Sequence, residues 1–137
     1  MNKSVINKKV EINATSDKVW RVFTDPVVTR QMGGEYNTDW KVGSPFGWVG
    51  NDGKMYTNGS ILKLIPKALL QHNLFNPENK TQIMSVITYR LQPGTHGKTL
   101  LIAHEDLKYE MTDQEYEAVS EGWDSALKAL KETAEKL

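Results

Sequence analysis

The C-terminal segment, residues 113–137, places the strongest limit on how this chain can fold, because it has the pattern of one long amphipathic helix. Thr112 and Glu115 have the spacing of a capping box, so the helix is predicted to begin at Asp113. Apolar residues then recur at three- and four-residue steps: Tyr116, Val119, Trp123, Ala126, Leu127, Leu130, Ala134 and Leu137. Because such a helix is stabilised mainly by covering its apolar face, the rest of the chain must supply a broad apolar surface.

A glycine and a tryptophan interrupt this helix at its middle, in the stretch EGWDSALKALKE. Glycine inside a helix costs about 1 kcal/mol relative to alanine, so it usually marks a place where bulk must be avoided. We expect Gly122 to make room beside Trp123 for a large ring or another backbone.

Short apolar runs separated by Gly, Pro, Asn and Asp fill the chain between residues 35 and 106, which is typical of successive antiparallel strands. The predicted strands are Tyr36–Trp40, Phe46–Gly50, Met55–Ile65, Ala68–Phe75, Gln82–Leu91 and Lys98–Asp106. An additional strand, Val5–Asn13, is predicted before them from its alternation of apolar and polar residues.

Two short helices are predicted after the first strand. The first is capped by Thr15 or Ser16, and Pro26 either stops it or restarts a helix with Asp25 as a cap. The second covers Val27–Met32 and ends at two glycines. This order of elements predicts one α+β domain over residues 1–137 with a helix-grip fold: a curved antiparallel sheet wrapped around the long C-terminal helix.

Composition excludes several classes of function. Lysine plus arginine and aspartate plus glutamate number 17 each, so no net positive charge favours nucleic acid. The chain has no cysteine, which rules out disulfides, a thiol nucleophile and zinc-thiolate sites. The N-terminal residues lack the apolar run of a signal peptide, and no run is long enough to span a membrane, so we expect a cytoplasmic protein.

The order of landmarks resembles a known superfamily. The stretches that carry the likeness are ATSDKVWRVFTDP, YNTDWKVGSPFGWVGNDGKMYTNGSILKLIP, ALLQHNLF, TYRLQPGTHGKTLLIAHEDL and EGWDSALKALKE. In these stretches the chain is similar to the START-like, Bet v 1-like (SRPBCC) superfamily, and within it to the group of the activator of heat shock protein 90 ATPase and of a calicheamicin-sequestering protein. The resemblance implies the helix-grip fold and an apolar cavity between sheet and helix that binds hydrophobic small molecules.

The titratable residues suggest no catalytic or metal site. His96 and His104 bracket one predicted strand at a separation of about 26 Å, too far to share a metal, and His72 stands alone on another strand. No serine or threonine has the setting of an activated nucleophile. We therefore predict no metal, no cofactor and no catalytic residue.

The aromatic residues are the better candidates for a site, because small-molecule pockets are mostly apolar walls with a few polar orienting groups. The predicted ligand-binding residues are Trp48, Tyr56, Tyr89, His104 and Trp123. The same rings could instead simply fill the core. The leading hypothesis is a binder of a lipid, polyketide or flavonoid-like molecule. The alternatives are a cyclase or hydrolase that uses His104 as acid or base, and an interaction module for a chaperone or another protein.

Overall fold

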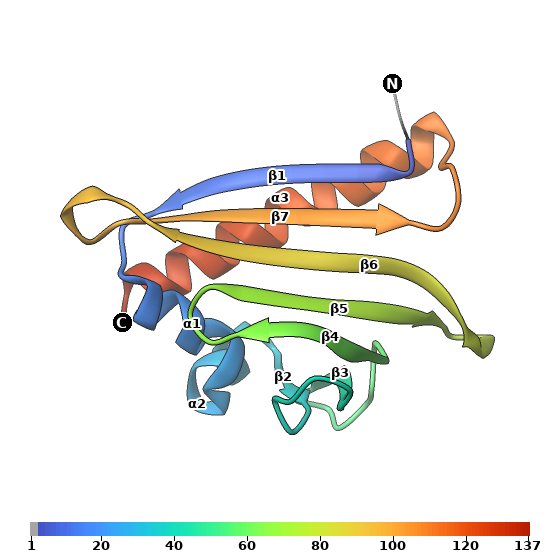
Figure 1. The fold of residues 1–137 in the computed structure, drawn as a ribbon, viewed down its shortest axis with the longest axis horizontal. Coiled ribbons are helices and arrows are strands. Elements are labelled where there is room, and N and C mark those ends of the chain that lie inside the picture. Colours follow the sequence, from blue (N-terminus) through green and yellow to red (C-terminus); the bar gives the residue numbers. More distant parts are fainter. Residues whose placement is uncertain (1–2) are drawn as a thin grey trace.

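The computed structural model describes residues 3–137, which form a seven-stranded antiparallel sheet and a long C-terminal helix (Figure 1). The strands follow the order β1-β7-β6-β5-β4-β3-β2. Their bounds are β1 Val5–Ile12, β2 Gly34–Asn37, β3 Pro45–Gly50, β4 Gly59–Ile65, β5 Leu69–Asn76, β6 Asn79–Pro93 and β7 Thr99–Leu107. The predicted α+β helix-grip fold is confirmed.

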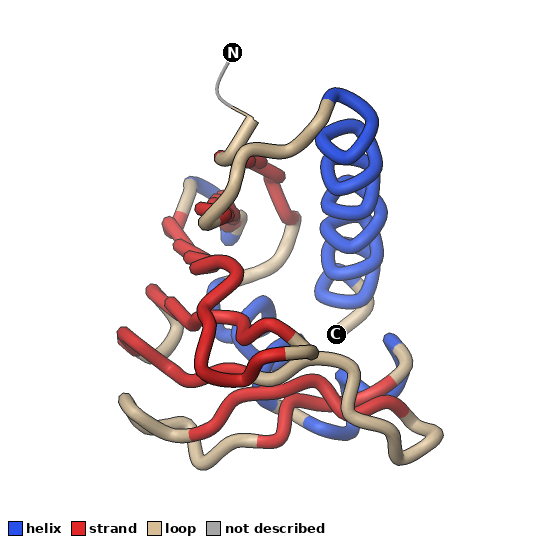
Figure 2. The backbone as a smooth tube through the Cα atoms, turned by 90° about the vertical axis from the view of Figure 1, so that its right-hand side faces the viewer, coloured by secondary structure: helices blue, strands red, loops and turns tan. Residues whose placement is uncertain are grey.

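Helix α3, Asp113–Glu135, runs along the concave face of the sheet, and Figure 2 shows it standing apart from the strands as a separate layer. The predicted capping box is present: the Thr112 hydroxyl accepts from the amide of Glu115, whose carboxylate accepts from the amide of Thr112. Salt bridges and hydrogen bonds tie α3 to β1 and to Lys3 just before it: Lys3 to Asp113, Lys8 to Asp124 and Ser120, and Lys131 to the Glu11 carbonyl. The helix is therefore anchored along one long side.

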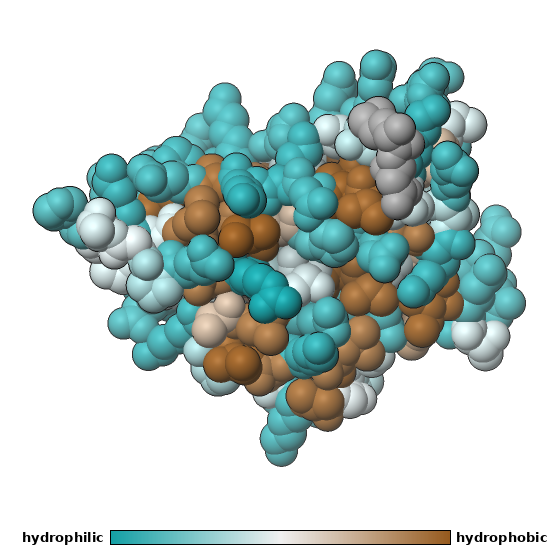
Figure 3. Space-filling view, turned by 45° about the horizontal axis from the view of Figure 1, so that its top comes forward, coloured by the Kyte–Doolittle hydropathy of each residue, from teal (hydrophilic) through white to brown (hydrophobic). Residues whose placement is uncertain are grey.

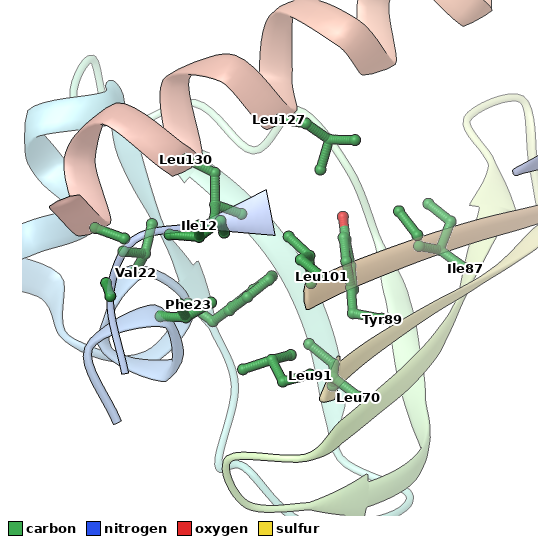
Figure 4. Close-up of a cluster of buried hydrophobic side chains, with 14 of the residues drawn as sticks. Ile12, Val22, Phe23, Leu70, Ile87, Tyr89, Leu91, Leu101, Leu127 and Leu130 are labelled. Atoms are coloured by element: carbon green, nitrogen blue, oxygen red, sulfur yellow. The ribbon is translucent and has the colours of Figure 1, made fainter. Parts of the chain in front are cut away.

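Three short helical segments close one end of the space between sheet and helix: α1 Ser16–Thr24, α2 Pro26–Thr29 and the 3-10 turn η1 Arg30–Met32. Thr15 caps α1 and Asp25 caps α2, as the sequence predicts. At this end, α1 and the last turns of α3 pack on the sheet around Val22, Phe23 and Leu130 (Figure 4). These side chains belong to the main hydrophobic core.

Two predicted strands are shorter in the structure. The first stops at Asn37, and Trp40 adopts a left-handed backbone with φ 55°, which is incompatible with a strand. The strand predicted to begin at Met55 begins at Gly59, where a Cβ atom would lie 1.9 Å from the Asn73 carbonyl oxygen. Only glycine fits at this close approach of the β4 and β5 backbones. Residues 55–58, before the strand, form a loop.

Strand β7 shows how the sheet separates inside from outside. Its odd-numbered residues, among them Leu101, Ala103 and Leu107, are buried beneath α3, whereas Ile102 and His104 lie on the outer face. The face of the molecule drawn in Figure 3 carries hydrophilic side chains interspersed with hydrophobic ones. The inner face is the one that can form a site.

Candidate functional site

A cavity of about 630 Å³ lies between the concave face of the sheet and α3. This volume is within the range of roughly 300–1,000 Å³ that small-molecule sites occupy. The wall is mainly aliphatic and aromatic: Val22, Phe23, Met32, Tyr36, Trp48, Thr57, His72, Leu74, Ile87, Tyr89, Glu105, Val119, Gly122, Trp123, Ala126, Leu127, Ala129 and Leu130. Apolar material is therefore what the hollow fits best.

Small residues on α3 leave this space open. Gly122, Ala126 and Ala129 follow one another along the helix at four- and three-residue steps, line the cavity, and are exposed. A Cβ atom built on Gly122 would meet no atom within 4 Å. The expectation of a ring or backbone pressed against Gly122 is therefore wrong, and the glycine borders open space instead.

A Gly122→Ala variant is expected to be more stable than the wild type by about 1 kcal/mol, because alanine favours the helix and its methyl group meets nothing. Thermal unfolding should show the melting temperature rising by roughly 3–5 °C. A lower melting temperature would mean that the space beside Gly122 is occupied.

Aromatic rings form a connected wall across the sheet. The Tyr36 ring stacks on Phe46 with centroids 4.4 Å apart and meets Trp48 at 4.9 Å. Farther along, the rings of Tyr89 and Trp123 approach to 5.8 Å, joining sheet to helix. Rings held against one another in this way keep fixed positions and give the cavity a defined shape.

Glu105 is a buried carboxylate in this apolar wall. One of its oxygens accepts from the Trp123 indole nitrogen and the other from the Ser85 hydroxyl, both at 2.9 Å. The first bond links β7 to α3 beside the cavity. Glu105 and Asp106 lie on opposite faces of β7, as expected for adjacent strand residues. Sequence reasoning missed Glu105 as a site residue, because placing His104 on the cavity wall turns the adjacent Glu105 to the other face.

His72 is another polar group of the wall that the sequence did not assign to the site. Its ring is 3 % exposed, packs on Phe46 at a centroid distance of 4.4 Å, and places Nδ1 3.1 Å from the Asn73 carbonyl oxygen. Burial lowers the pKa of His72 to about 4, so the ring is neutral near pH 7. Within residues 3–137, its Nε2 atom has no hydrogen-bond partner.

This neutral histidine should make stability fall in acid. The folded state holds the pKa near 4 against 6.5 in an unfolded chain, so the unfolded chain binds more protons between these values. The stabilising contribution is complete above pH 6.5 and falls by ~3 kcal/mol as the pH drops toward 4. Urea unfolding at pH 7 and pH 4 should show this loss in the wild type and in His104→Phe, but not in His72→Phe. Equal losses in all three would contradict the assignment.

Two tyrosine hydroxyls are further polar groups of the wall. Burial raises the pKa of Tyr36 to about 12 and raises that of Tyr89 well above its usual value, with the nearby Tyr36 and Glu105 adding to the rise for Tyr89. Both phenols therefore stay protonated at neutral pH. Figure 4 shows the Tyr89 side chain rising from the sheet toward Leu127 on α3.

The structure brings three of the five predicted site residues together: Trp48, Tyr89 and Trp123 line the cavity. Tyr56 does not, because it lies in the loop before β4, is 60 % exposed, and donates its hydroxyl hydrogen bond to Asp52. It borders a separate hollow of about 360 Å³ instead. The expectation that Tyr56 lines the main cavity is corrected accordingly.

The position expected for His104 is also wrong. The residue shares a strand face with Leu100 and Ile102, as expected, but that face is the convex one. Its Nδ1 lies 2.6 Å from the Asn7 side-chain oxygen on the neighbouring strand β1. The apolar neighbours suggested an inner face, although Leu101, Ala103 and Leu107 form an equally apolar series one residue out of phase.

Among the described residues, no group of three or more acidic or histidine side chains is placed to hold a metal ion. Nor does any helix within residues 3–137 combine the length and the apolar character that crossing a bilayer requires.

A curved antiparallel sheet closed by a C-terminal helix over a cavity defines the START-like, helix-grip class of proteins. The chain belongs to the family of Activator of Hsp90 ATPase homolog 1-like proteins, whose model matches residues 13–135. No functionally curated protein matches it in sequence.

Several solved structures share the fold. ChR145 from Cytophaga hutchinsonii is 27 % identical, with a TM-score of 0.78 and coverage of 99 % of this chain and 97 % of that one. The Aha1 dimer from Colwellia psychrerythraea is 20 % identical, with a TM-score of 0.76 and 96 % of each chain covered. CalU16 from Micromonospora echinospora is 24 % identical, with a TM-score of 0.73 and coverage of 95 % and 75 %. The last two show likeness of fold alone.

Proposed function

We propose that this protein binds an apolar, ring-containing small molecule in the cavity beneath α3. The observation that carries the proposal is the hollow of about 630 Å³ itself, walled by aromatic and aliphatic side chains. A concave space of this volume with mainly apolar walls and a few polar groups has the character of a small-molecule site. Gly122, Ala126 and Ala129 add little side-chain volume to this space from α3.

The position of His104 bears on the enzymatic alternative. Proton transfer by His104 to a bound ligand requires the ring to reach the cavity, and the ring lies on the opposite face of the sheet. The mechanism that the sequence suggested therefore has no geometric support. Binding requires only the wall that is present.

The family's name favours a second candidate function, an interaction module for the Hsp90 chaperone. Stimulation of Hsp90 ATPase activity by the purified chain, unaffected by filling the cavity, would favour this candidate over ligand binding.

Native mass spectrometry of the purified protein, followed by thermal-shift measurements with flavonoids, polyketides and fatty acids, tests the binding function. A ligand present at 100 times its dissociation constant stabilises the folded state by about 2.7 kcal/mol, which should raise the melting temperature by roughly 10 °C. Absence of any bound mass and of any stabilisation across these classes would contradict the proposal.

A further inference from the structure

We propose, on the basis of the binding function above, that the cavity selects neutral ring compounds that carry a hydroxyl group, with the Nε2 atom of His72 as the acceptor for that hydroxyl. The class of ligand follows from which polar atoms of the wall are already paired and which are free.

The tautomer of His72 follows from its one hydrogen bond. A backbone carbonyl only accepts, so the nitrogen facing the Asn73 oxygen at 3.1 Å must carry the ring proton. In the neutral ring, Nε2 is then a bare lone pair that can only accept. This atom is buried without a partner in the described part of the chain, and leaving such a group unpaired is costly. A ligand O–H donor would satisfy it.

The remaining charge of the wall argues against an anionic ligand. Glu105 places a carboxylate beside the cavity, and its two bonds come from the neutral donors Ser85 and Trp123. No lysine or arginine is present among the cavity-lining residues that the structure describes. A ligand carboxylate would therefore lose its hydration without gaining a cation, so fatty-acid anions should bind poorly.

The tyrosine hydroxyls are compatible with the same ligand class. A phenol can both donate and accept, and the Tyr89 hydroxyl points toward the space beneath α3 (Figure 4). The Tyr89 hydroxyl donates to that of Tyr36, so the Tyr36 proton is left to pair with a second oxygen of a ligand, such as a carbonyl. The Nε2 atom of His72 differs from these hydroxyls because it has no proton to donate and can only accept.

A matched set of three probes tests this selectivity at pH 7: 2-naphthol, 2-methoxynaphthalene and 2-naphthoate. Their dissociation constants are measured by isothermal titration calorimetry with the wild type, His72→Phe and the control His104→Phe. We expect the wild type and His104→Phe to bind the naphthol about tenfold more tightly than its methyl ether, and the naphthoate most weakly. In His72→Phe the naphthol and ether should bind equally.

The outcomes separate this inference from the proposed function. If the naphthol and the ether bind the wild type equally, the selectivity is wrong and apolar binding stands. If no probe binds, both are wrong. Should His72→Phe fail to fold, the ¹⁵N resonance of His72 Nε2 in the wild type provides the test. It should shift on adding 2-naphthol and stay in place on adding the ether, and equal responses to both would overturn the inference.

Discussion

Replacing Ala126 by tryptophan is expected to weaken the binding of apolar molecules by roughly 100-fold while leaving the protein folded. Ala126 lines the cavity from α3 and has an exposed side chain, so a large ring at this position would occupy space that a ligand needs. Excluding about 100 Å² of apolar ligand contact at ~25 cal/mol per Å² removes about 2.5 kcal/mol of binding free energy. The dissociation constant of 2-naphthol, measured by calorimetry, reports the change.

Ser125→Trp is the matched control, because Ser125 is the neighbouring residue on the same helix, is exposed, and does not line the cavity. It introduces the same side chain with a similar effect on helix propensity. Its binding should equal that of the wild type. If the two variants bind alike, the ligand does not lie beneath α3.

Replacing Phe46 by alanine is expected to lower the free energy of unfolding by about 3–5 kcal/mol, the largest loss of stability that we predict for a single substitution. Phe46 is 1 % exposed and is the largest fully buried side chain. Its ring contacts Tyr36 and His72 at centroid distances of 4.4 Å and Trp40 at 5.8 Å. Removing it would deprive three rings of a shared neighbour, and urea denaturation measures the loss.

Val42→Ala serves as the comparison, since Val42 lies between β2 and β3 and is 65 % exposed. It should change stability by less than about 0.5 kcal/mol. A loss of less than about 1 kcal/mol for Phe46→Ala would show that the aromatic wall rearranges easily, and the cavity would then lack a defined shape.

The elements with local signals could be predicted from the sequence. Helix α3 begins at Asp113 because Thr112 and Glu115 satisfy each other's backbone amides, and such a signal needs no knowledge of the fold. The caps Thr15 and Asp25 were predictable for the same reason. Strand ends were less predictable. The start of β4 at Gly59 depends on the close approach of its backbone to Asn73 on β5, which local sequence does not reveal.

The site was predicted only in part, because its geometry depends on which face of each strand turns inward. In β7 both faces carry apolar residues, so alternation alone could not decide between His104 and Glu105. His72, between Gln71 and Asn73 on β5, gave no sign that its second nitrogen would remain unpaired. Rings such as Trp48 and Trp123 were easier to assign, since large aromatic residues seldom stay outside.

The most direct test of the cavity as the binding site is a nuclear Overhauser experiment on the protein with bound 2-naphthol. Cross-peaks are predicted between the naphthol ring and the methyl groups of Ile87 and Leu127, which line the cavity from the sheet and from α3. Cross-peaks confined to Met55 and Met84, which border the smaller hollow, would place the ligand elsewhere and contradict the account.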